Sequence, residues 1–408
     1  MKNKQYRATL FFFLFILHKV VLSQAFKEES GKAGIDHFFY NVDQLGGGLA
    51  FLDFNNDGFE DIYVTGGSHA DKLYENQGDE TFQDVSETHG INVLSQINTV
   101  GVSAADFDND GYTDLFISTD IDDRCYILWN KEGGFFEEKG IEGNITEEFF
   151  GTSIAVGDYD LDGDLDIYVG NYRLLTGDAF YRNNGNRTFT NVSESLLGDK
   201  SKGIAWAVAF SDWDLDNDID ILIGNDFGNI AQPNRLFQNN YPENAFTEIS
   251  ENVSFDEEMN SMGIAVGDYD EDGDLDYYIA DTGNNNFFVN NGGQFNDKAL
   301  ELGIGNPEGT SWGSTFVDYN NDMFLDLLVM NGEVGLKDGL LHENKLYKGN
   351  GTSFEDVSAI EGVNSYFTSR GMALGDYNND GKIDFASAVV DNQPNSNSHF
   401  LLYRNKNN

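Results

Sequence analysis

Aspartates recur in this sequence at a spacing that can surround a metal ion. Residues 158–166 read DYDLDGDLD, which places carboxylates at positions one, three, five, seven and nine of a nine-residue segment. Several hard oxygen donors on one tight turn form the kind of ligand set that Ca²⁺ takes. Glycine at position six permits the positive φ angle that such a turn requires. We therefore expect this segment to be a calcium loop.

The pattern occurs seven times, and successive copies begin 50 to 58 residues apart. In each copy we expect ligands from the side chains at positions one, three and five and from the backbone carbonyl at position seven. The carboxylate at position nine can bind through both oxygens. The predicted ligands, copy by copy, are Asp53, Asn55, Asp57, Phe59 and Asp61; Asp106, Asp108, Asp110, Tyr112 and Asp114; Asp158, Asp160, Asp162, Asp164 and Asp166; Asp212, Asp214, Asp216, Asp218 and Asp220; Asp268, Asp270, Asp272, Asp274 and Asp276; Asp318, Asn320, Asp322, Phe324 and Asp326; and Asp376, Asn378, Asp380, Lys382 and Asp384.

The seven copies differ in ways that predict unequal affinity for calcium. Met323 stands at position six of the sixth copy, where positive φ is costly for a bulky side chain, whereas Asn217 in the fourth copy tolerates it better. Asparagine at position three removes one negative charge from the first, sixth and seventh copies. We expect up to seven calcium ions, with the sixth site the weakest.

Acidic turns of this kind have two other interpretations. An EF-hand begins in the same way, but it needs a carboxylate at position twelve, between two helices. No copy has one; the residues at position twelve are Val64, Ile117, Val169, Ile223, Ile279, Val329 and Ser387. A solvated turn whose aspartates cap backbone groups is the alternative for any single copy. Seven copies in register favour the metal site, because carboxylates so close together would otherwise repel one another.

Short strand patterns flank every loop. Small residues alternate before a loop, as at Gly263 and Ala265, which suits a strand packed closely around an axis. An apolar strand follows the loop, as at residues 221–223, and two further strands follow, as at residues 180–183 and 188–192. Four strands per repeat make one propeller blade. We therefore predict an all-β chain folded as a closed seven-bladed β-propeller with four-stranded blades.

The two ends of the chain indicate how the ring closes. The last repeat ends at its third strand, at residues 401–405. Residues 25–30 (AFKEES) resemble the fourth strand of the first repeat at residues 81–86 (TFQDVS). We expect the N-terminal strand to complete the C-terminal blade, which removes exposed sheet edges. The propeller is thus expected over residues 24–408.

Residues 1–23 are typical of a secretory signal peptide. Lys2, Lys4 and Arg7 form a basic start, and an apolar run follows at residues 8–17. A membrane anchor is the alternative, but this run is too short to span a bilayer comfortably. We expect cleavage after Ser23 and a mature protein that is secreted, or held at the cell surface or in the periplasm, without membrane insertion.

The charge of the chain excludes several classes of partner. Acidic residues outnumber basic ones 70 to 24, for a formal net charge of −46. Nucleic acids and anionic membranes are disfavoured, because binding them needs clustered lysine and arginine. The same charge favours a soluble monomer. The single cysteine, Cys125, excludes an intramolecular disulfide, and we expect it to be a buried small hydrophobe.

The loop motif, its sevenfold recurrence and the preceding small-residue strand resemble the FG-GAP/VCBS repeats of integrin-α-type propellers. Residues 262–270 (MGIAVGDYD), 225–228 (NDFG) and 369–373 (SRGMA) are similar to the cartilage acidic protein family. This resemblance implies a secreted calcium-binding propeller whose ligands are met on the face opposite the calcium loops. Members commonly carry a C-terminal ASPIC/UnbV domain, which we expect this chain to lack.

Signals for an enzyme are weak. Residues 309–313 (GTSWG) match the G-x-S-x-G pattern of a nucleophile elbow, but a strand rather than a helix is expected to follow. His69 and His342 are expected to be surface residues rather than a catalytic pair. The tryptophans Trp206, Trp213 and Trp312 serve blade packing or, alternatively, form a platform on which a sugar stacks. No catalytic residue is predicted.

Three functions stay open at this point. The first, which we favour, is a binding module for a protein or glycan, with specificity carried by residues 170–178, 225–234 and 331–343. These connections between second and third strands are longer than the others. The second is a calcium-assisted enzyme acting on acidic polysaccharide. The third is a structural spacer at a surface or in a matrix.

Overall fold

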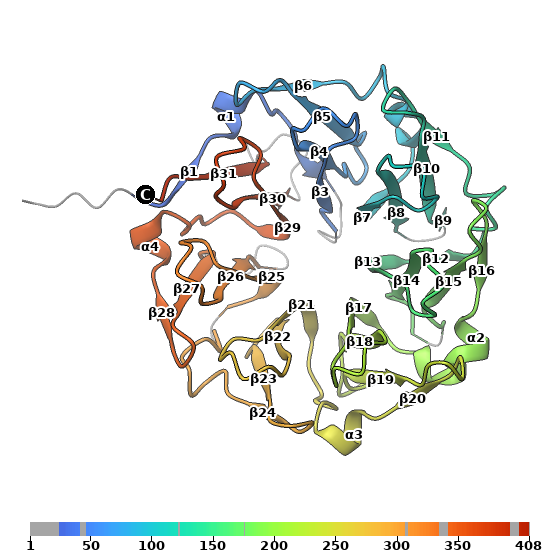
Figure 1. Cartoon of the computed structure of the whole chain (residues 1–408). Helices are drawn as coiled ribbons and strands as arrows, with labels where there is room; N and C mark the ends of the chain where they lie inside the picture. Colours follow the sequence, from blue (N-terminus) through green and yellow to red (C-terminus); the bar gives the residue numbers. More distant parts are fainter. Residues whose placement is uncertain are drawn as a thin grey trace, which may run out of the picture.

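Four-stranded antiparallel sheets stand around one axis like the blades of a propeller (Figure 1). This computed structural model describes residues 24–40, 46–120, 123–174, 176–306, 309–333, 342–391 and 400–407. In the first six blades the strands run outward from the axis in chain order. The predicted closed seven-bladed β-propeller is confirmed, whereas the predicted signal peptide lies outside the described residues.

The strand bounds follow the repeat. Blades one to three comprise β3 (Leu49–Leu52), β4 (Asp61–Val64), β5 (Lys72–Asn76) and β6 (Phe82–Asp84); β7 (Thr99–Ala105), β8 (Asp114–Thr119), β10 (Tyr126–Asn130) and β11 (Phe136–Glu138); and β13 (Gly151–Gly157), β14 (Asp166–Asn171), β15 (Ala179–Asn183) and β16 (Phe189–Asn191). Blades four to six comprise β17 (Ala205–Ser211), β18 (Asp220–Asn225), β19 (Arg235–Asn239) and β20 (Phe246–Glu248); β21 (Ser261–Gly267), β22 (Asp276–Asp281), β23 (Asn286–Asn290) and β24 (Phe295–Asp297); and β25 (Ser311–Val317), β26 (Asp326–Asn331), β27 (Lys345–Gly349) and β28 (Phe354–Asp356).

The seventh blade joins the two ends of the chain. It consists of β29 (Ser369–Gly375), β30 (Asp384–Asp391), β31 (Leu401–Asn405) and, as its outer strand, β1 (Phe26–Glu28). Strand β1 pairs antiparallel with β31, with Phe26 opposite Asn405. The prediction that the N-terminal strand completes the last blade is therefore confirmed.

A few short elements lie outside this plan. Strand β2 (Phe39–Tyr40) pairs parallel with β30, and β9 (Asp123–Arg124) pairs with β12 (Glu148–Phe149) between the second and third blades. Single-turn helices follow the outer strands and lie at the rim in Figure 1: α1 (Ser30–Ala33), α2 (Ser193–Leu196), α3 (Ser250–Val253) and α4 (Ser358–Glu361), with 3₁₀ turns η1 (Ile91–Leu94) and η2 (Gly198–Ser201). Within the described part of the chain, no helix has the length and apolarity to cross a membrane.

Small residues on the inner strands allow the blades to meet at the axis. A Cβ atom on Gly263 would lie 2.2 Å from the carbonyl oxygen of Trp312, and one on Gly371 would lie 2.2 Å from that of Gly47. Neighbouring inner strands thus approach too closely for a side chain at these positions. This is the physical reason for the alternating small residues in the sequence.

The hydrophobic core lies mainly between adjacent blades. Phe116, Trp129 and Tyr181, for example, belong to the cluster between the second and third blades, and so does Cys125, which is 1% exposed as predicted. A smaller cluster of Trp206, Met262 and Trp312 lies at the axis. Packing of blade against blade therefore holds the ring together and fixes the ends of the strands that carry the loops.

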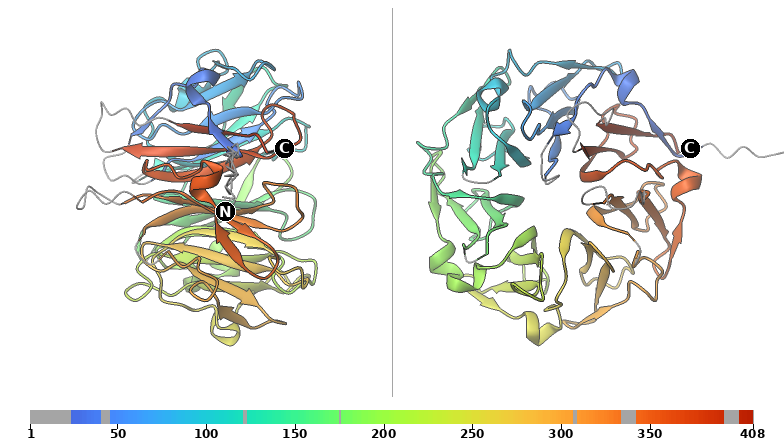
Figure 2. Two further views of the ribbon diagram at one scale, coloured as in Figure 1. Left: turned by 90° about the vertical axis from the view of Figure 1, so that its left-hand side faces the viewer. Right: turned by 180° about the vertical axis from the view of Figure 1, so that it is seen from behind.

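The antiparallel strands give the ring two different faces, seen from the side and from behind in Figure 2. One face, the acidic-loop face, carries the seven loops between first and second strands and the hairpins between third and fourth strands. The opposite face carries the connections between second and third strands and those between successive blades. Any ligand of the longer connections must therefore approach from the side away from the acidic loops.

Candidate metal centres

Each acidic loop is folded around its first aspartate. In the third blade, Asp158 Oδ1 accepts a hydrogen bond of 3.1 Å from the backbone N–H of Asp162, and Oδ2 accepts one of 2.9 Å from Gly163. The same two bonds occur in all seven loops, at 2.7 to 3.1 Å. The first aspartate therefore shapes the turn as well as facing its centre.

The backbone at position six is left-handed in all seven loops, with φ between 74° and 95°. Glycine fills five of these positions, and Asn217 and Met323 fill the others, so the predicted role of this glycine is confirmed. Position four is also left-handed in every loop, with φ between 55° and 60°, which the sequence analysis missed. Asparagine at position four in four loops was a usable signal, because asparagine adopts positive φ more readily than most residues.

Carboxylates at positions one, three and nine converge in four of the loops. One oxygen from each of the three lies within 4.8 Å of the others. These triads are Asp106, Asp108 and Asp114; Asp158, Asp160 and Asp166; Asp212, Asp214 and Asp220; and Asp268, Asp270 and Asp276. The remaining loops have asparagine at position three, whose side chain offers a carbonyl oxygen instead. The donor set of oxygens alone suits Ca²⁺.

The carboxylate at position nine is the most buried of the set. Asp166 is fully buried; its Oδ2 accepts the N–H of Tyr159 at 3.0 Å and its Oδ1 that of Asn183 at 2.8 Å. All seven position-nine aspartates are 0% exposed and accept a backbone N–H from the end of the third strand. Backbone donors thus use one lone pair on each oxygen of Asp166, and the other lone pairs stay open to a cation.

Burial raises the pKa of every position-nine carboxyl. The pKa rises to about 7 at Asp61, Asp276 and Asp326 and to about 8 at Asp114, Asp166, Asp220 and Asp384, because the charged form loses its hydration. Neighbouring carboxylates of the same loop raise it further. A divalent cation in the loop would oppose both effects.

Two oxygens at position three provide a direct test of whether the loops fit a metal. Asp160 Oδ1 and Asp270 Oδ1 are buried and have no hydrogen-bond donor. A buried carboxylate oxygen without a donor is costly unless a cation satisfies it. Each atom belongs to a residue of a triad, so the residues present fit a calcium ion held by positions one, three and nine.

Positions five and seven have other contacts. In all seven loops the position-five aspartate accepts the backbone N–H of position seven through Oδ1, at 2.9 to 3.2 Å, and it is not part of the triads. At position seven, Asp218 accepts the N–H of Tyr241 at 3.1 Å and Asp274 that of Gly292 at 2.9 Å. These two side chains therefore hold the neighbouring hairpins.

Basic side chains already neutralise part of three loops. Arg187 contacts Asp108 and lies 3.3 Å from Asp110 in the second loop. In the sixth loop Lys348 lies 3.0 Å from Asp322. In the seventh, Arg404 lies 3.6 Å from Asp380. The third, fourth and fifth loops, each with five aspartates, are thus the strongest candidates for tight binding.

A recurring asparagine was overlooked as part of the site. Asn183 ends the third strand of its blade; its N–H donates to Asp166, and its Nδ2 donates at 2.7 Å to the carbonyl of Phe107 in the preceding loop. Equivalent asparagines end the third strand in six of the seven blades, and Gly349 takes this place in the sixth. The repetition of this residue was visible in the sequence, but its bond to the preceding blade was not.

Comparison with known proteins identifies the repeat. Residues 53–117, 106–169, 212–279 and 268–329 match the FG-GAP-like repeat and together cover more than half of the chain. The chain belongs to the FG-GAP-like repeat family. Its matched segments run from one acidic loop to the second strand of the next blade, so the family signature coincides with the candidate metal centres.

This FG-GAP propeller is also similar to two named relatives. Cartilage acidic protein 1 of Xenopus tropicalis is 26% identical over 209 residues, which are 47% of this chain and 30% of the relative. Cartilage acidic protein 1 of Mus musculus is 24% identical over 321 residues, which are 70% of this chain and 48% of the relative. The chain therefore spans less than half the length of either relative. A crystal structure of BBS1N in complex with ARL6DN, soaked with mercury, shares the fold alone: TM-score 0.53, 11% identity, 94% of this chain and 96% of that one.

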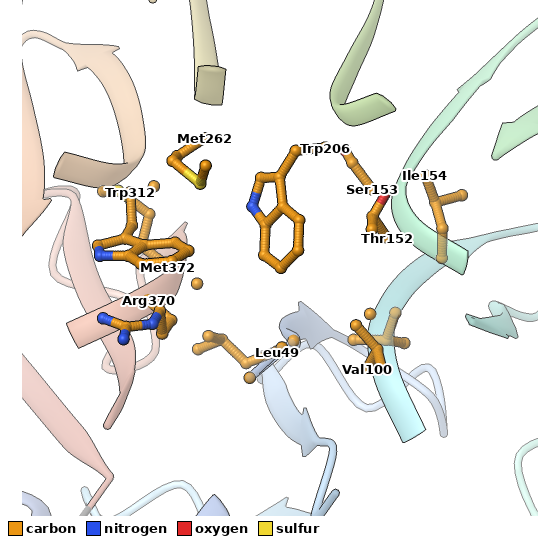
Figure 3. A pocket seen from close by; sticks show the side chains of 17 residues that line it. Leu49, Val100, Thr152, Ser153, Ile154, Trp206, Met262, Trp312, Arg370 and Met372 are labelled. Carbon is orange, nitrogen blue, oxygen red and sulfur yellow. The ribbon is translucent and has the colours of Figure 1, made fainter. Parts of the chain in front are cut away.

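The structure also places the serine, histidine and tryptophan residues that the sequence offered as candidates for catalysis or sugar binding. Ser311 begins β25, is buried and donates to Asn331 Oδ1 at 2.8 Å, so a strand follows the G-x-S-x-G segment as expected. His69 is exposed, and His342 Nε2 lies 2.7 Å from Glu333. Trp213 packs against Phe295 between blades. Trp206 and Trp312, by contrast, line a central cavity of about 250 Å³ (Figure 3).

Proposed function

We propose that this protein is a secreted calcium-binding propeller that acts as a binding or adhesion module for a protein or glycan ligand. Support comes from the connection between β18 and β19 on the opposite face. There Phe227 is 43% exposed and Ile230 is 75% exposed. Large apolar side chains presented to solvent on a connection held by rigid strands favour a partner that covers them.

Calcium has a structural role in this proposal. The triads lie on the acidic-loop face, away from Phe227, so a bound ion would act on the ligand through the rigidity of the blade. Each ion held only by the folded state at 100 times its Kd adds ~2.7 kcal/mol of stability. In this proposal the carboxylates of the acidic loops stabilise the propeller, and the ligand binds to the opposite face.

The experiment compares two pairs of exposed apolar residues. Phe227→Ser with Ile230→Ser removes the pair on the β18–β19 connection, and Ile141→Ser with Leu300→Ser removes two that are 62% and 67% exposed on other connections. Binding of the purified protein to arrays of cell-surface proteins and glycans is measured in calcium and in EDTA. We expect saturable, calcium-dependent binding that the first pair of changes abolishes and the second does not. Equal binding by both variants would contradict the proposal.

Secretion is part of the same proposal, because residues 1–23 have the pattern of a signal peptide. Expression with and without these residues, followed by N-terminal sequencing of the exported protein, tests it. We expect export only of the longer form, and cleavage after Ser23. An uncleaved protein retained inside the cell would refute this part.

An enzyme acting on acidic polysaccharide is less well supported. Among the described residues that line the central cavity and the pocket beside it, Arg370 is the one basic side chain. Its guanidinium stacks 3.7 Å above the Trp312 ring and donates to backbone carbonyls, including that of Glu333 at 3.0 Å. Recognition of a polyanion needs several basic groups on one surface.

A further inference from the structure

A pocket of about 400 Å³ opens beside the axis on the opposite face. Its lining includes Tyr172, Trp206, Met262 and Trp312 together with the carboxylates of Asp226 and Glu333. We call it the aromatic pocket. Trp206, Met262 and Trp312 also line the central cavity, so the two spaces share one wall (Figure 3).

The aromatic rings of this pocket are held in fixed positions. The Trp206 and Trp312 rings meet edge to face, with centroids 5.8 Å apart, and Tyr172 meets Trp206 at 5.0 Å. Trp312 Nε1 donates to the carbonyl of Gly332 at 2.6 Å, and Arg370 covers one face of its ring. A rigid group of aromatic edges and faces is therefore present before any ligand arrives.

The charged groups of the pocket are acidic. Asp226 is 5% exposed; its Oδ2 accepts the Tyr172 hydroxyl at 3.0 Å and its Oδ1 the N–H of Phe227 at 2.8 Å. Glu333 lies 2.7 Å from His342. The described residues that line the pocket include no lysine or arginine. Burial raises the pKa of Asp226, a cost that a cation in the pocket would offset.

The rim of the pocket is strained at one residue. Phe227 lines it with φ of 53° and is the one aromatic residue with positive φ among those described. Positive φ is costly for a bulky side chain, and such strain gathers at functional positions. Phe227 is 43% exposed, so packing inside the protein offsets only part of this cost, and a ligand at the rim would cover the rest of the side chain.

We propose that the aromatic pocket receives a cationic side chain, the ammonium of lysine or the guanidinium of arginine, from a basic protein ligand. A cation in this pocket gains charge-assisted hydrogen bonds from the buried carboxylate of Asp226, and cation–π attraction from Tyr172, which is partly exposed where Trp206 and Trp312 are buried. The net charge of −46 steers such a partner toward the protein. A neutral sugar is disfavoured, because the charged side chains that line the pocket, Asp226 and Glu333, are both acidic and would pair with a cation.

The proposal rests on the proposed function, in that it names the chemistry of the ligand. The test uses protein labelled with 5-fluorotryptophan and ¹⁹F NMR, with Trp206 and Trp312 in the pocket and Trp129 and Trp213 elsewhere as internal controls. The probes are the Nα-acetyl methylamides of arginine and lysine at millimolar concentration. Citrulline methylamide, which has the shape of arginine without its charge, and neutral oligosaccharides are the controls. We expect the cationic probes alone to shift the two pocket resonances.

Matched variants test the role of the carboxylate. Asp226→Asn removes the pocket charge, whereas Asp178→Asn removes an equally buried carboxylate that also accepts a tyrosine hydroxyl but lies outside the pocket. Both make the formal net charge less negative by the same amount, and thermal melts confirm that each variant folds. We expect Asp226→Asn to weaken probe binding about tenfold or more, the loss of one charge-assisted bond, and Asp178→Asn to leave it unchanged.

Three results would overturn the proposal: no shift with either cation, equal shifts with citrulline or sugars, or equal weakening by both variants. These results are distinct from failure of the proposed function. If the Phe227→Ser, Ile230→Ser pair still abolishes binding on the arrays while the cationic probes leave Trp206 and Trp312 unshifted, the binding module stands and the cationic pocket does not.

Discussion

The side-chain amide of Asn76 donates a hydrogen bond of 2.7 Å to the backbone carbonyl of Tyr377, 301 residues further along the chain. This bond joins the first blade to the acidic loop of the seventh. The N–H of the same asparagine donates to Asp61 Oδ1 at 2.8 Å. One residue thus connects the buried carboxylate of its own loop to the loop of the preceding blade.

The connection is repeated around the ring. Asn130, Asn183, Asn239, Asn290 and Asn405 donate in the same way to the carbonyls of Phe54, Phe107, Tyr159, Trp213 and Tyr319, at 2.7 to 3.4 Å. Gly349 in the sixth blade cannot, since it has no side chain. A metal held by the loops would therefore stabilise contacts between blades and not only its own turn.

Asn183→Ala is expected to destabilise the protein by about 1–3 kcal/mol, because the buried carbonyl of Phe107 loses its donor. Denaturant unfolding followed by fluorescence measures the change. Asn296→Ala, at an exposed position on β24, serves as the control and should change stability by less than about 0.5 kcal/mol. Equal effects of the two substitutions would show that the bridge between blades contributes nothing.

Calcium is expected to raise the melting temperature strongly over that in excess EDTA, with bound metal counted in parallel. Asp160→Asn should weaken this effect, because it removes a triad carboxylate whose Oδ1 has no other partner. In EDTA the variant should be no less stable than the parent, since repulsion within the loop falls. Identical calcium shifts in parent and variant would refute the assignment of Asp160 as a ligand.

The fold could be predicted from the sequence because each of the seven repeats has the same pattern of loop and strands. Seven copies of one loop, the flanking strands and the fourth strand at the N-terminus were enough for the ring and its closure. Two features needed coordinates: the bridge from Asn183 to the loop of the preceding blade, and the meeting of Trp206 with Trp312 at the axis. Each depends on contacts between residues far apart in the chain, which no local pattern records.

The metal-free protein is expected to lose stability as the pH rises from about 4 to 8. The position-nine aspartates have pKa values of about 7 to 8 when folded, above their usual 3.8, so the folded state holds protons that the unfolded chain releases. Their contribution is fully present below pH 3.8 and is lost as the pH passes through 7 to 8. Calcium needs the deprotonated form and should reverse this slope. The test is to measure the melting temperature at several pH values, in EDTA and in calcium. A melting temperature in EDTA that does not change with pH would contradict the expectation.

Asp178→Asn isolates one such group far from the candidate metal centres. Asp178 is 4% exposed and accepts the Tyr168 hydroxyl at 2.7 Å and the N–H of Asn171 at 2.8 Å, and burial raises its pKa to about 7. In the fifth blade Asn285 takes the same place and donates to the Tyr278 hydroxyl at 2.6 Å. The variant should therefore fold and gain about 1 kcal/mol or more above pH 7, with no gain near pH 4. A variant less stable than the parent at pH 8 would show that the carboxylate itself is needed.

The sixth loop offers a reciprocal test of backbone strain. Met323 holds φ of 75° at position six, with its side chain 82% exposed, so packing does not repay the strain. Met323→Gly should therefore stabilise the protein by up to about 1 kcal/mol, the relief of strain less the entropy that glycine costs. Gly381→Met, at φ of 81° in the seventh loop, should destabilise it by about 1–2 kcal/mol.

Calorimetric titration should show tighter calcium binding in the first variant and weaker binding in the second, because the turn must hold this backbone to present its oxygens. If neither stability nor calcium affinity changes in these directions, Met323 is not the reason for a weak sixth calcium site.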